Sequence, residues 1–249
     1  MDTDRRTGSS SFKDARFATT HWSMVLTAQN ASSPDYRHAL SMLCEAYWFP
    51  LYAFLRRRGY DRHRSEDTTQ GFFTALMEKQ GLRTVDSERG RFRSYLLGAL
   101  KHYLADEYDR DRAQKRGGGH DILSLDFGEA ETRYAYEPSD DATPEVQFQK
   151  SWALMLLDRT LKRVREEAIR ANNETLFDHL KGYLTGDCSS TPYGVMADTL
   201  GMTEGAIRTA VHRLRVSYRR CLRQEIAQTV SSQDEIEEEL RDLFDAFSA

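Results

Sequence analysis

A chain of 249 residues is long enough for one or two small domains. It is 39% hydrophobic and 30% charged, with a formal net charge of -4, which allows modest cores beneath a very polar surface. No apolar run approaches the roughly 20 residues of a membrane span, and no apolar segment follows the basic residues at the N-terminus. The three cysteines are far apart and form no CxxC pair. We therefore expect a cytoplasmic chain without a disulfide framework, a zinc site or a membrane segment.

The usual signatures of nucleotide-binding and hydrolytic enzymes are missing: there is no Walker loop, GxGxxG, GxSxG or HExxH. We expect no enzymatic activity, no cofactor and no metal. Charge is instead segregated along the chain. Residues 89–116 hold eight Lys/Arg against four Asp/Glu, and residues 203–225 hold six against two. Between them, residues 117–149 hold eight acids against Arg133 alone. Two basic segments separated by an acidic one predict two contact surfaces for a polyanion, although each could also be an ordinary solvated face.

Apolar residues at three- and four-residue spacing predict a helix over residues 36–60, with a kink or break near Phe49 because Pro50 lacks an amide donor. A second helix over residues 65–80 is predicted to begin with Ser65 as its N-cap and to stop at Gly81. A third extends from residue 90 toward the glycines at 117–119. Residues 117–145 show neither helical nor strand periodicity, which predicts a linker.

Helical patterns resume over residues 146–170 and 173–184, and no segment alternates with a period of two. We therefore predict an all-α fold of two small helical domains joined by an acidic linker. The predicted segments are a flexible tail (1–19), a first domain (20–116), the linker (117–148), a second domain (149–227) and an acidic C-terminal tail (228–249). The tail has Ile236, Leu240 and Leu243 at helical spacing, and its seven acids suit a solubilising end or a partner-binding or inhibitory helix.

The segment STPYGVMADTLGMTEGAIRTAVHRLRVSYRR predicts a helix-turn-helix. Thr191 with Pro192 is a start signal for a short helix, Gly201 supplies the turn, and Thr203 caps a longer helix. On the longer helix one arc is apolar and predicted to be buried: Ile207, Val211, Leu214 and Tyr218. The opposite side carries small residues, hydroxyls and cations, which suits entry into a DNA major groove. Its members are Thr203, Gly205, Arg208, Thr209, His212, Arg213 and Arg220. An ordinary helical hairpin with a glycine turn is the alternative.

The stretch GRFRSYLLGALKHYL mixes cations with rings on one predicted helix. Leu96, Leu97, Leu100, Tyr103 and Leu104 form its predicted core face. The other face carries Tyr95, Gly98, Lys101 and His102, with Arg91 and Arg93 at the helix start. A ring flanked by cations can hold an unpaired nucleic-acid strand by base stacking and charge neutralisation. Packing of Tyr95 on a neighbouring helix, with His102 a plain surface residue, is the alternative.

Both constellations, in this order, resemble bacterial RNA polymerase sigma factors of the sigma-70 superfamily, extracytoplasmic-function (ECF) group, over roughly residues 20 to 227. FRSYLLGALKHYLADEYDR resembles the promoter-melting helix, with Tyr95 at a Trp position and His102 at an Asn position. SEDTTQGFFTAL resembles the polymerase-clamp helix, except that Gly71 replaces a usual Glu. MTEGAIRTAVHRLR is similar to the region-four recognition helix. KRGGG, LSLD and the long linker resemble a planctomycete-type subgroup.

The resemblance implies a sigma factor that binds the clamp helices and the flap of core RNA polymerase. It also implies that the chain promotes promoter DNA melting for transcription initiation. It implies core-polymerase contacts at Glu66, Asp67, Gln70 and Phe73. It implies minus-10 contacts at Arg91, Arg93, Tyr95, Gly98, Lys101 and His102. It implies minus-35 contacts along the exposed side of the recognition helix from Thr203 to Arg220. An anti-sigma factor or another regulator is a further candidate partner.

Two other classes are weighed against this one. A helix-turn-helix transcriptional regulator would use the C-terminal helices alone, with residues 20–116 as a sensor or dimerisation domain, and would bind duplex DNA unaided. An all-helical enzyme would need catalytic groups that converge on one site. The candidate pairs, His102 with Asp106 and Glu66 with Asp67, lack any recognised metal-binding or acid–base motif around them. Acids in the first turn of a helix account for Glu66 and Asp67 more simply.

Overall fold

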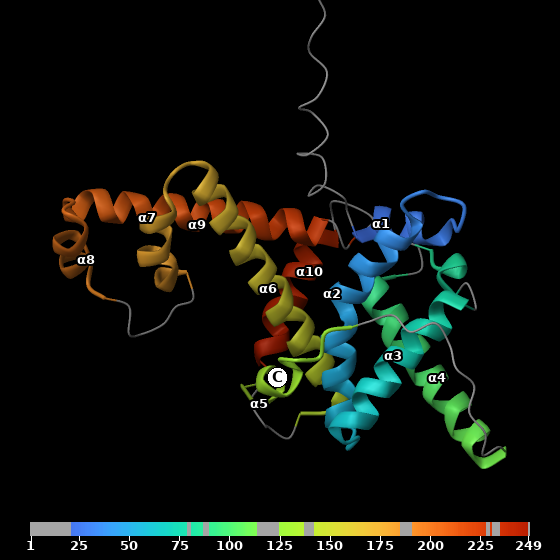
Figure 1. Cartoon of the computed structure of the whole chain (residues 1–249). Coiled ribbons are helices and arrows are strands. Elements are labelled where there is room, and N and C mark those ends of the chain that lie inside the picture. Colours follow the sequence, from blue (N-terminus) through green and yellow to red (C-terminus); the bar gives the residue numbers. More distant parts are fainter. Residues whose placement is uncertain are drawn as a thin grey trace, which may run out of the picture. The chain divides into compact units, whose positions relative to one another are not determined.

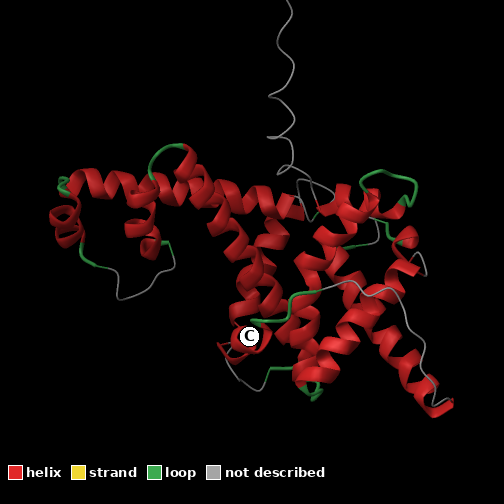
Figure 2. Cartoon of the chain, in the orientation of Figure 1, coloured by secondary structure: helices red, strands yellow, loops and turns green. Residues whose placement is uncertain are grey.

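The computed structural model describes residues 21–78, 81–86, 90–113, 125–136, 142–184, 191–227, 230 and 235–248. Within these ranges all regular structure is helical, so the predicted all-α class is confirmed (Figures 1 and 2). The chain divides into two compact units, Met1–Asp140 with Gln228–Ser232 and Asp141–Ala227 with Gln233–Ala249. The predicted tail 1–19, the KRGGG stretch and Cys188 lie outside the described residues. No helix in the described part of the chain has the length and hydrophobicity that a membrane span needs.

The first unit is built around α2 (Tyr36–Arg57), which packs against α1 (His21–Gln29), α3 (Arg62–Glu78) and α4 (Phe92–Ala113). A short 3-10 turn, η2 (Gly81–Thr84), follows α3. The core side chains are bulky and fully covered, and among the largest are Tyr52, Phe54, Phe73, Leu96 and Leu100. Of the kink or break predicted near Phe49, the break is wrong, because α2 continues through Pro50. Pro50 is buried with the residues around it, and this packing offsets the missing backbone hydrogen bond.

The start of α3 also differs from the prediction. The helix begins at Arg62, and the backbone N–H of Arg64 donates to the Asp61 carboxylate at 2.8 Å. Asp61 is therefore the residue that caps α3, while Ser65 lies inside the helix and is buried. Sequence periodicity placed the start too late because Arg62, His63 and Arg64 add no apolar residue to the pattern.

Part of the predicted linker is folded in the first unit. Helix α5 (Ala130–Tyr136) lies against α2, with Ala130 fully buried beside Phe49 and Tyr52. Glu131 accepts a hydrogen bond from the Tyr52 hydroxyl, and its carboxylate lies 3.2 Å from the guanidinium of Arg56. The acidic segment is thus held to α2 by apolar packing on Phe49 and Tyr52 and by the ion pair between Glu131 and Arg56.

The second unit contains α6 (Pro144–Arg170), α7 (Glu174–Leu180), α8 (Tyr193–Leu200), α9 (Glu204–Ala227) and α10 (Glu235–Ser248), with a 3-10 turn, η4 (Lys181–Tyr183), after α7. Helix α6 begins inside the stretch predicted as linker, because Thr143 caps it by accepting from the Val146 N–H at 3.3 Å. Proline at the first helical position completes this start signal.

The acidic tail forms α10, which packs on α6 and α9. Its predicted helical spacing is confirmed, and Ile236, Leu243 and Ala246 are buried. Arg223 of α9 forms an ion pair with Glu237. The tail is therefore part of the fold of the second unit and is more than a solubilising end.

Candidate nucleic-acid interface

The turn between α8 and α9 has the geometry that the sequence predicts. Gly201 ends α8 in the left-handed region, with φ 63 and ψ 30, where residues with a side chain are disfavoured. Met202 closes the turn by donating its N–H to the carbonyl of Ala197 at 2.9 Å. Thr203 then caps α9, its hydroxyl oxygen accepting from the Ala206 N–H at 3.2 Å.

The start of α8 differs in detail. Pro192, rather than Thr191, occupies the cap position, and no side chain caps this end of the helix. The carbonyl of Thr191 instead accepts a hydrogen bond from the Tyr183 hydroxyl. Thr191, just before the cap of α8, is thus tied to the end of η4.

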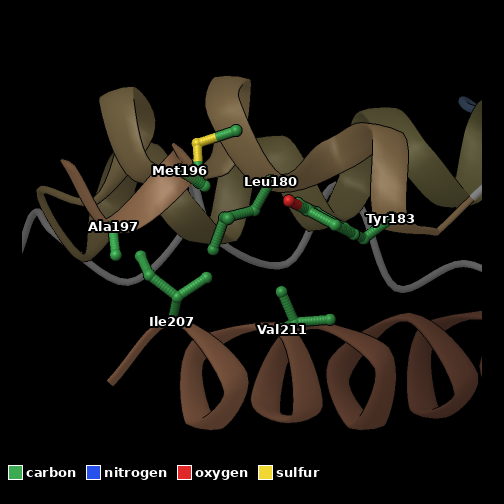
Figure 3. Packing of buried hydrophobic residues seen from close by; sticks show 6 residues of the cluster. All are labelled: Leu180, Tyr183, Met196, Ala197, Ile207 and Val211. Atoms are coloured by element: carbon green, nitrogen blue, oxygen red, sulfur yellow. The ribbon is translucent and has the colours of Figure 1, made fainter. Parts of the chain in front are cut away.

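A small core joins α8 and α9 and fixes which side of α9 faces outward. Figure 3 shows Ile207 and Val211 of α9 pointing toward side chains from η4 and the helices opposite. The cluster consists of Leu180, Tyr183, Met196, Ala197, Ile207 and Val211. Leu214 is half-buried against this core, and Tyr218 packs on a second cluster with Val164. The predicted buried arc of α9 is confirmed for Ile207 and Val211, while Leu214 and Tyr218 are partly buried on the same side.

All the residues predicted to face the minus-35 element are exposed: Thr203, Gly205, Arg208, Thr209, His212, Arg213 and Arg220. Two of these cations have intramolecular partners. Arg208 pairs with Glu204 one turn earlier, and Arg220 forms an ion pair with Glu167 of α6. The Thr209 hydroxyl donates to the Gly205 carbonyl at 2.9 Å. The structure thus presents a cationic, hydroxyl-bearing face on the first three turns of α9, while Arg220 also ties α9 to α6.

Sequence reasoning missed the network that joins α6 to α9. Glu225 is buried and accepts from Arg163 at 3.0 Å, with Arg159 at 3.8 Å. Burial acts to raise the pKa of Glu167, but hydrogen bonds from Arg220 and Ser217 lower it overall. These charged residues hold α9 in place, and only the four-residue spacing of Arg159 and Arg163 marks them in the sequence.

Arg215 was also missed. It is exposed on α9, yet its guanidinium donates to the Tyr183 carbonyl at 3.2 and 3.4 Å. It therefore braces the segment before α8 against α9.

The ring-and-cation face of α4, which we define as Arg91, Tyr95, Gly98, Lys101 and His102, is only partly open. Lys101 and His102 are exposed, while the other three are half-buried. A Cβ built on Gly98 would meet nothing within 4 Å, so the surface there is open to a flat group. The Lys101 ammonium lies 5.9 Å from the centroid of the Phe54 ring, beside the second half of α2.

Arg93 does not belong to this face. It is 4% exposed, so its side chain cannot reach DNA on the surface described here. Burial, and then the charge of Arg91, lower its pKa to about 9. Tyr95 stacks on Phe92, with centroids 6.1 Å apart and planes at 20°, and Phe92 in turn packs edge-on against Tyr47 of α2. Helix α4 therefore uses its first turn to bind α2, and one face of the Tyr95 ring is already covered.

On α3, the predicted polymerase contacts also divide. Asp67 is exposed, Gln70 is half-buried, and Glu66 is half-buried and pairs with Arg62 at 2.8 Å. Phe73 is 2% exposed and lies in the core, so it supports the helix and does not present a contact surface.

Gly71 has a structural explanation. A Cβ there would lie 2.6 Å from the Tyr103 hydroxyl oxygen, so glycine lets Tyr103 of α4 approach α3 closely. Tyr103 also packs edge-on against Phe72, with ring centroids 5.9 Å apart. The departure from the clamp-helix pattern thus follows from helix packing.

The candidate interface consists of two cationic faces, the partly open ring-and-cation face of α4 in the first unit and the exposed start of α9 in the second. No cluster of His, Cys, Asp or Glu among the described residues is arranged to hold a metal ion. Compared with known proteins, the chain matches no protein-family model, no curated protein and no solved structure.

Proposed function

We propose that the chain is a sigma factor of bacterial RNA polymerase, of the ECF group, that recognises promoter DNA and promotes its melting. The observation that carries the proposal is that two cationic helix faces of different chemistry occur in separate compact units. The face on α9 suits duplex DNA, and the face on α4, with its ring, suits unpaired bases.

The α9 face supports a duplex-reading role. Its exposed Gly205 and Thr209 leave room for close approach, and His212 and Arg213 supply hydrogen-bond donors and positive charge beside them. The buried arc opposite and the network to α6 keep this face in a fixed orientation. In this proposal the α9 face reads the minus-35 element in the major groove.

The α4 face supports strand capture. Tyr95 is held by Phe92 on one side, so it forms a rigid platform, and Gly98 one turn away leaves space for a base. Lys101 and His102 follow Gly98 on the exposed side of α4; Lys101 would neutralise the backbone of the captured strand, and the His102 ring is a further polar contact. Stacking contributes about 1–3 kcal/mol per base, comparable with the cost of unstacking it. In this proposal binding alone traps bases of the minus-10 element as they open.

Asp67, Gln70 and Glu66 on α3 are the proposed contacts with core polymerase, and Phe73 supports them from the core. A conventional helix-turn-helix regulator would need only the α9 face and would bind duplex DNA without polymerase.

Run-off transcription tests the proposal. Purified full-length chain is added to core polymerase on a fragmented genomic template, with core alone as the control. We expect discrete transcripts that require the chain. No chain-dependent transcript, together with tight duplex binding in the absence of core, would favour the regulator instead.

A further inference from the structure

An additional positively charged surface lies where α2 turns into α3. Residues 56–64, RRRGYDRHR, hold five arginines and His63 against Asp61 alone. We call this segment the basic corner. The cations at the end of α2 suit a helix C-terminus. That preference does not explain His63 and Arg64 at the start of α3, nor the ring of Tyr60 between the two helices.

The backbone of the basic corner is fixed. Gly59 has φ 94, a conformation that side-chain-bearing residues rarely adopt, and its N–H donates to the Arg56 carbonyl at 3.0 Å. Tyr60 donates its N–H to the Leu55 carbonyl at 3.1 Å, and Asp61 caps α3 through the Arg64 N–H. The two helix ends therefore hold their cations at a defined separation.

The cations of the basic corner are not equally engaged. Arg56 pairs with Glu131, and Arg62 pairs with Glu66. Arg58, His63 and Arg64 are exposed and form no ion pair within the described part of the chain. The Arg64 guanidinium lies over the Tyr60 ring, 4.4 Å from its centroid, and this contact orders a side chain that is exposed at the surface.

The basic corner continues the ring-and-cation face of α4. Lys101 of that face lies over Phe54, and Arg58 follows Phe54 by four residues, about one helical turn, on α2. Lys101 and Arg58, the residue that caps α2, thus lie near the same end of α2 within the first unit.

We propose that the basic corner binds the phosphate backbone of DNA, through Arg58, His63 and Arg64. A guanidinium presents a planar set of donors that matches a phosphate, and Arg58 and Arg64, which have no carboxylate partner in the described part of the chain, gain most from a polyanion, with the His63 ring as a further donor beside them. Continuity with a ring-bearing face favours a nucleic-acid strand over an acidic protein surface, because one strand can place a base on Tyr95 and its phosphates along α2. The proposal rests on the proposed function in taking DNA as the polyanion.

The test uses the full-length chain and a fluorescent single-stranded DNA oligonucleotide, with affinity measured by anisotropy over a salt series. The variant is Arg58→Gln/Arg64→Gln. The matched control is Arg37→Gln/Arg83→Gln, which removes the same charge from exposed positions of the same unit. Arg37 lies in the first turn of α2, roughly 30 Å along the helix from Arg58. A third variant, Arg58→Lys/Arg64→Lys, keeps the charge and removes the guanidinium group. It separates the effect of charge from the effect of side-chain shape.

Each lost phosphate contact lowers the slope of log affinity against log salt by about 0.7 for a single strand. We expect the magnitude of the slope to fall by about 1.4 in the corner variant and to stay unchanged in the control. The lysine variant should keep most of the wild-type slope. Equal slopes for corner and control variants, or no binding by the wild-type chain at low salt, would overturn the proposal.

Association with core polymerase is measured in parallel on a sizing column. Loss of that association with an unchanged DNA slope would identify the basic corner as a contact for an acidic protein surface and overturn the proposal. A corner-dependent DNA slope in a chain that never associates with core would leave this inference standing and refute the proposed function. The reverse pattern, association with core and a wild-type slope in the corner variant, would refute only the inference.

Discussion

The two candidate DNA faces differ in how closely they follow their sequence patterns. On α9 every predicted contact residue is exposed, and the apolar arc opposite is covered. On α4 one predicted contact, Arg93, is buried, and the ring of Tyr95 is half covered by Phe92.

The difference comes from the number of neighbours at each face. The first three turns of α9 bury a single arc, centred on Ile207 and Val211. Helix α4 has two neighbours, with Phe92 against Tyr47 of α2 and Tyr103 against Phe72 of α3. A helical wheel locates one apolar stripe, so it predicts the exposed side well only when a helix is covered from one direction.

The largest expected effect contrasts two residues of α3. Phe73→Ala should lower the free energy of unfolding by about 3–5 kcal/mol, because a fully covered ring leaves a cavity. Asp67→Ala, at an exposed position, should change it by less than about 0.5 kcal/mol and should instead weaken association with core polymerase. Urea unfolding and co-migration on a sizing column measure the two quantities. If Phe73→Ala kept normal stability but lost association with core polymerase, Phe73 would be a direct contact with the polymerase.

Two glycines sharpen the contrast between covered and open helix surface. Gly98→Ala should stabilise the chain by about 1 kcal/mol, since its Cβ meets no neighbour. Gly71→Ala should gain less or lose stability, because its Cβ meets the Tyr103 hydroxyl. Replacing Tyr103 with Phe should restore the gain, with a coupling of about 0.5–1 kcal/mol in a double-mutant cycle followed by urea unfolding. Additive effects at the two sites would show that Gly71 is not needed for the approach of Tyr103.

Two nearby arginines separate contact from support on α9. Arg215→Ala should cost about 1 kcal/mol of stability, because it removes the hydrogen bonds to the Tyr183 carbonyl. Arg213→Ala should leave stability within about 0.5 kcal/mol and lower the salt slope of promoter binding by about 0.9. Thermal unfolding and a salt series with the polymerase complex give both values. A reversal of the two effects would place Arg215 at the DNA.

Much of the second unit could be predicted from its sequence because its signals are local. The Gly201 turn, the Thr203 cap and the arc of Ile207 and Val211 each depend on residues within a few positions of one another. The helical spacing of the acidic tail is a local signal of the same kind. The surface on α6 and α9 that the tail packs against could not be predicted from this local pattern.

The remainder depends on partners far apart in the chain. Helix α5 has only seven residues, too few for a periodic pattern, and is held by Tyr52 and Arg56 of α2. The Arg163–Glu225 pair joins residues 62 positions apart. Arg93 is likewise buried, although the local pattern gives a charged residue no reason to be covered.

The most direct measurement of the central claim is permanganate reactivity of unpaired thymines on a promoter identified by run-off transcription. Core polymerase with the wild-type chain should open the DNA, and neither component alone should do so. Tyr95→Ala should associate with core normally but reduce opening by about 5- to 150-fold, the equivalent of losing one stacked base. Opening that is unchanged in Tyr95→Ala, or promoter DNA bound equally well without core polymerase, would contradict the account.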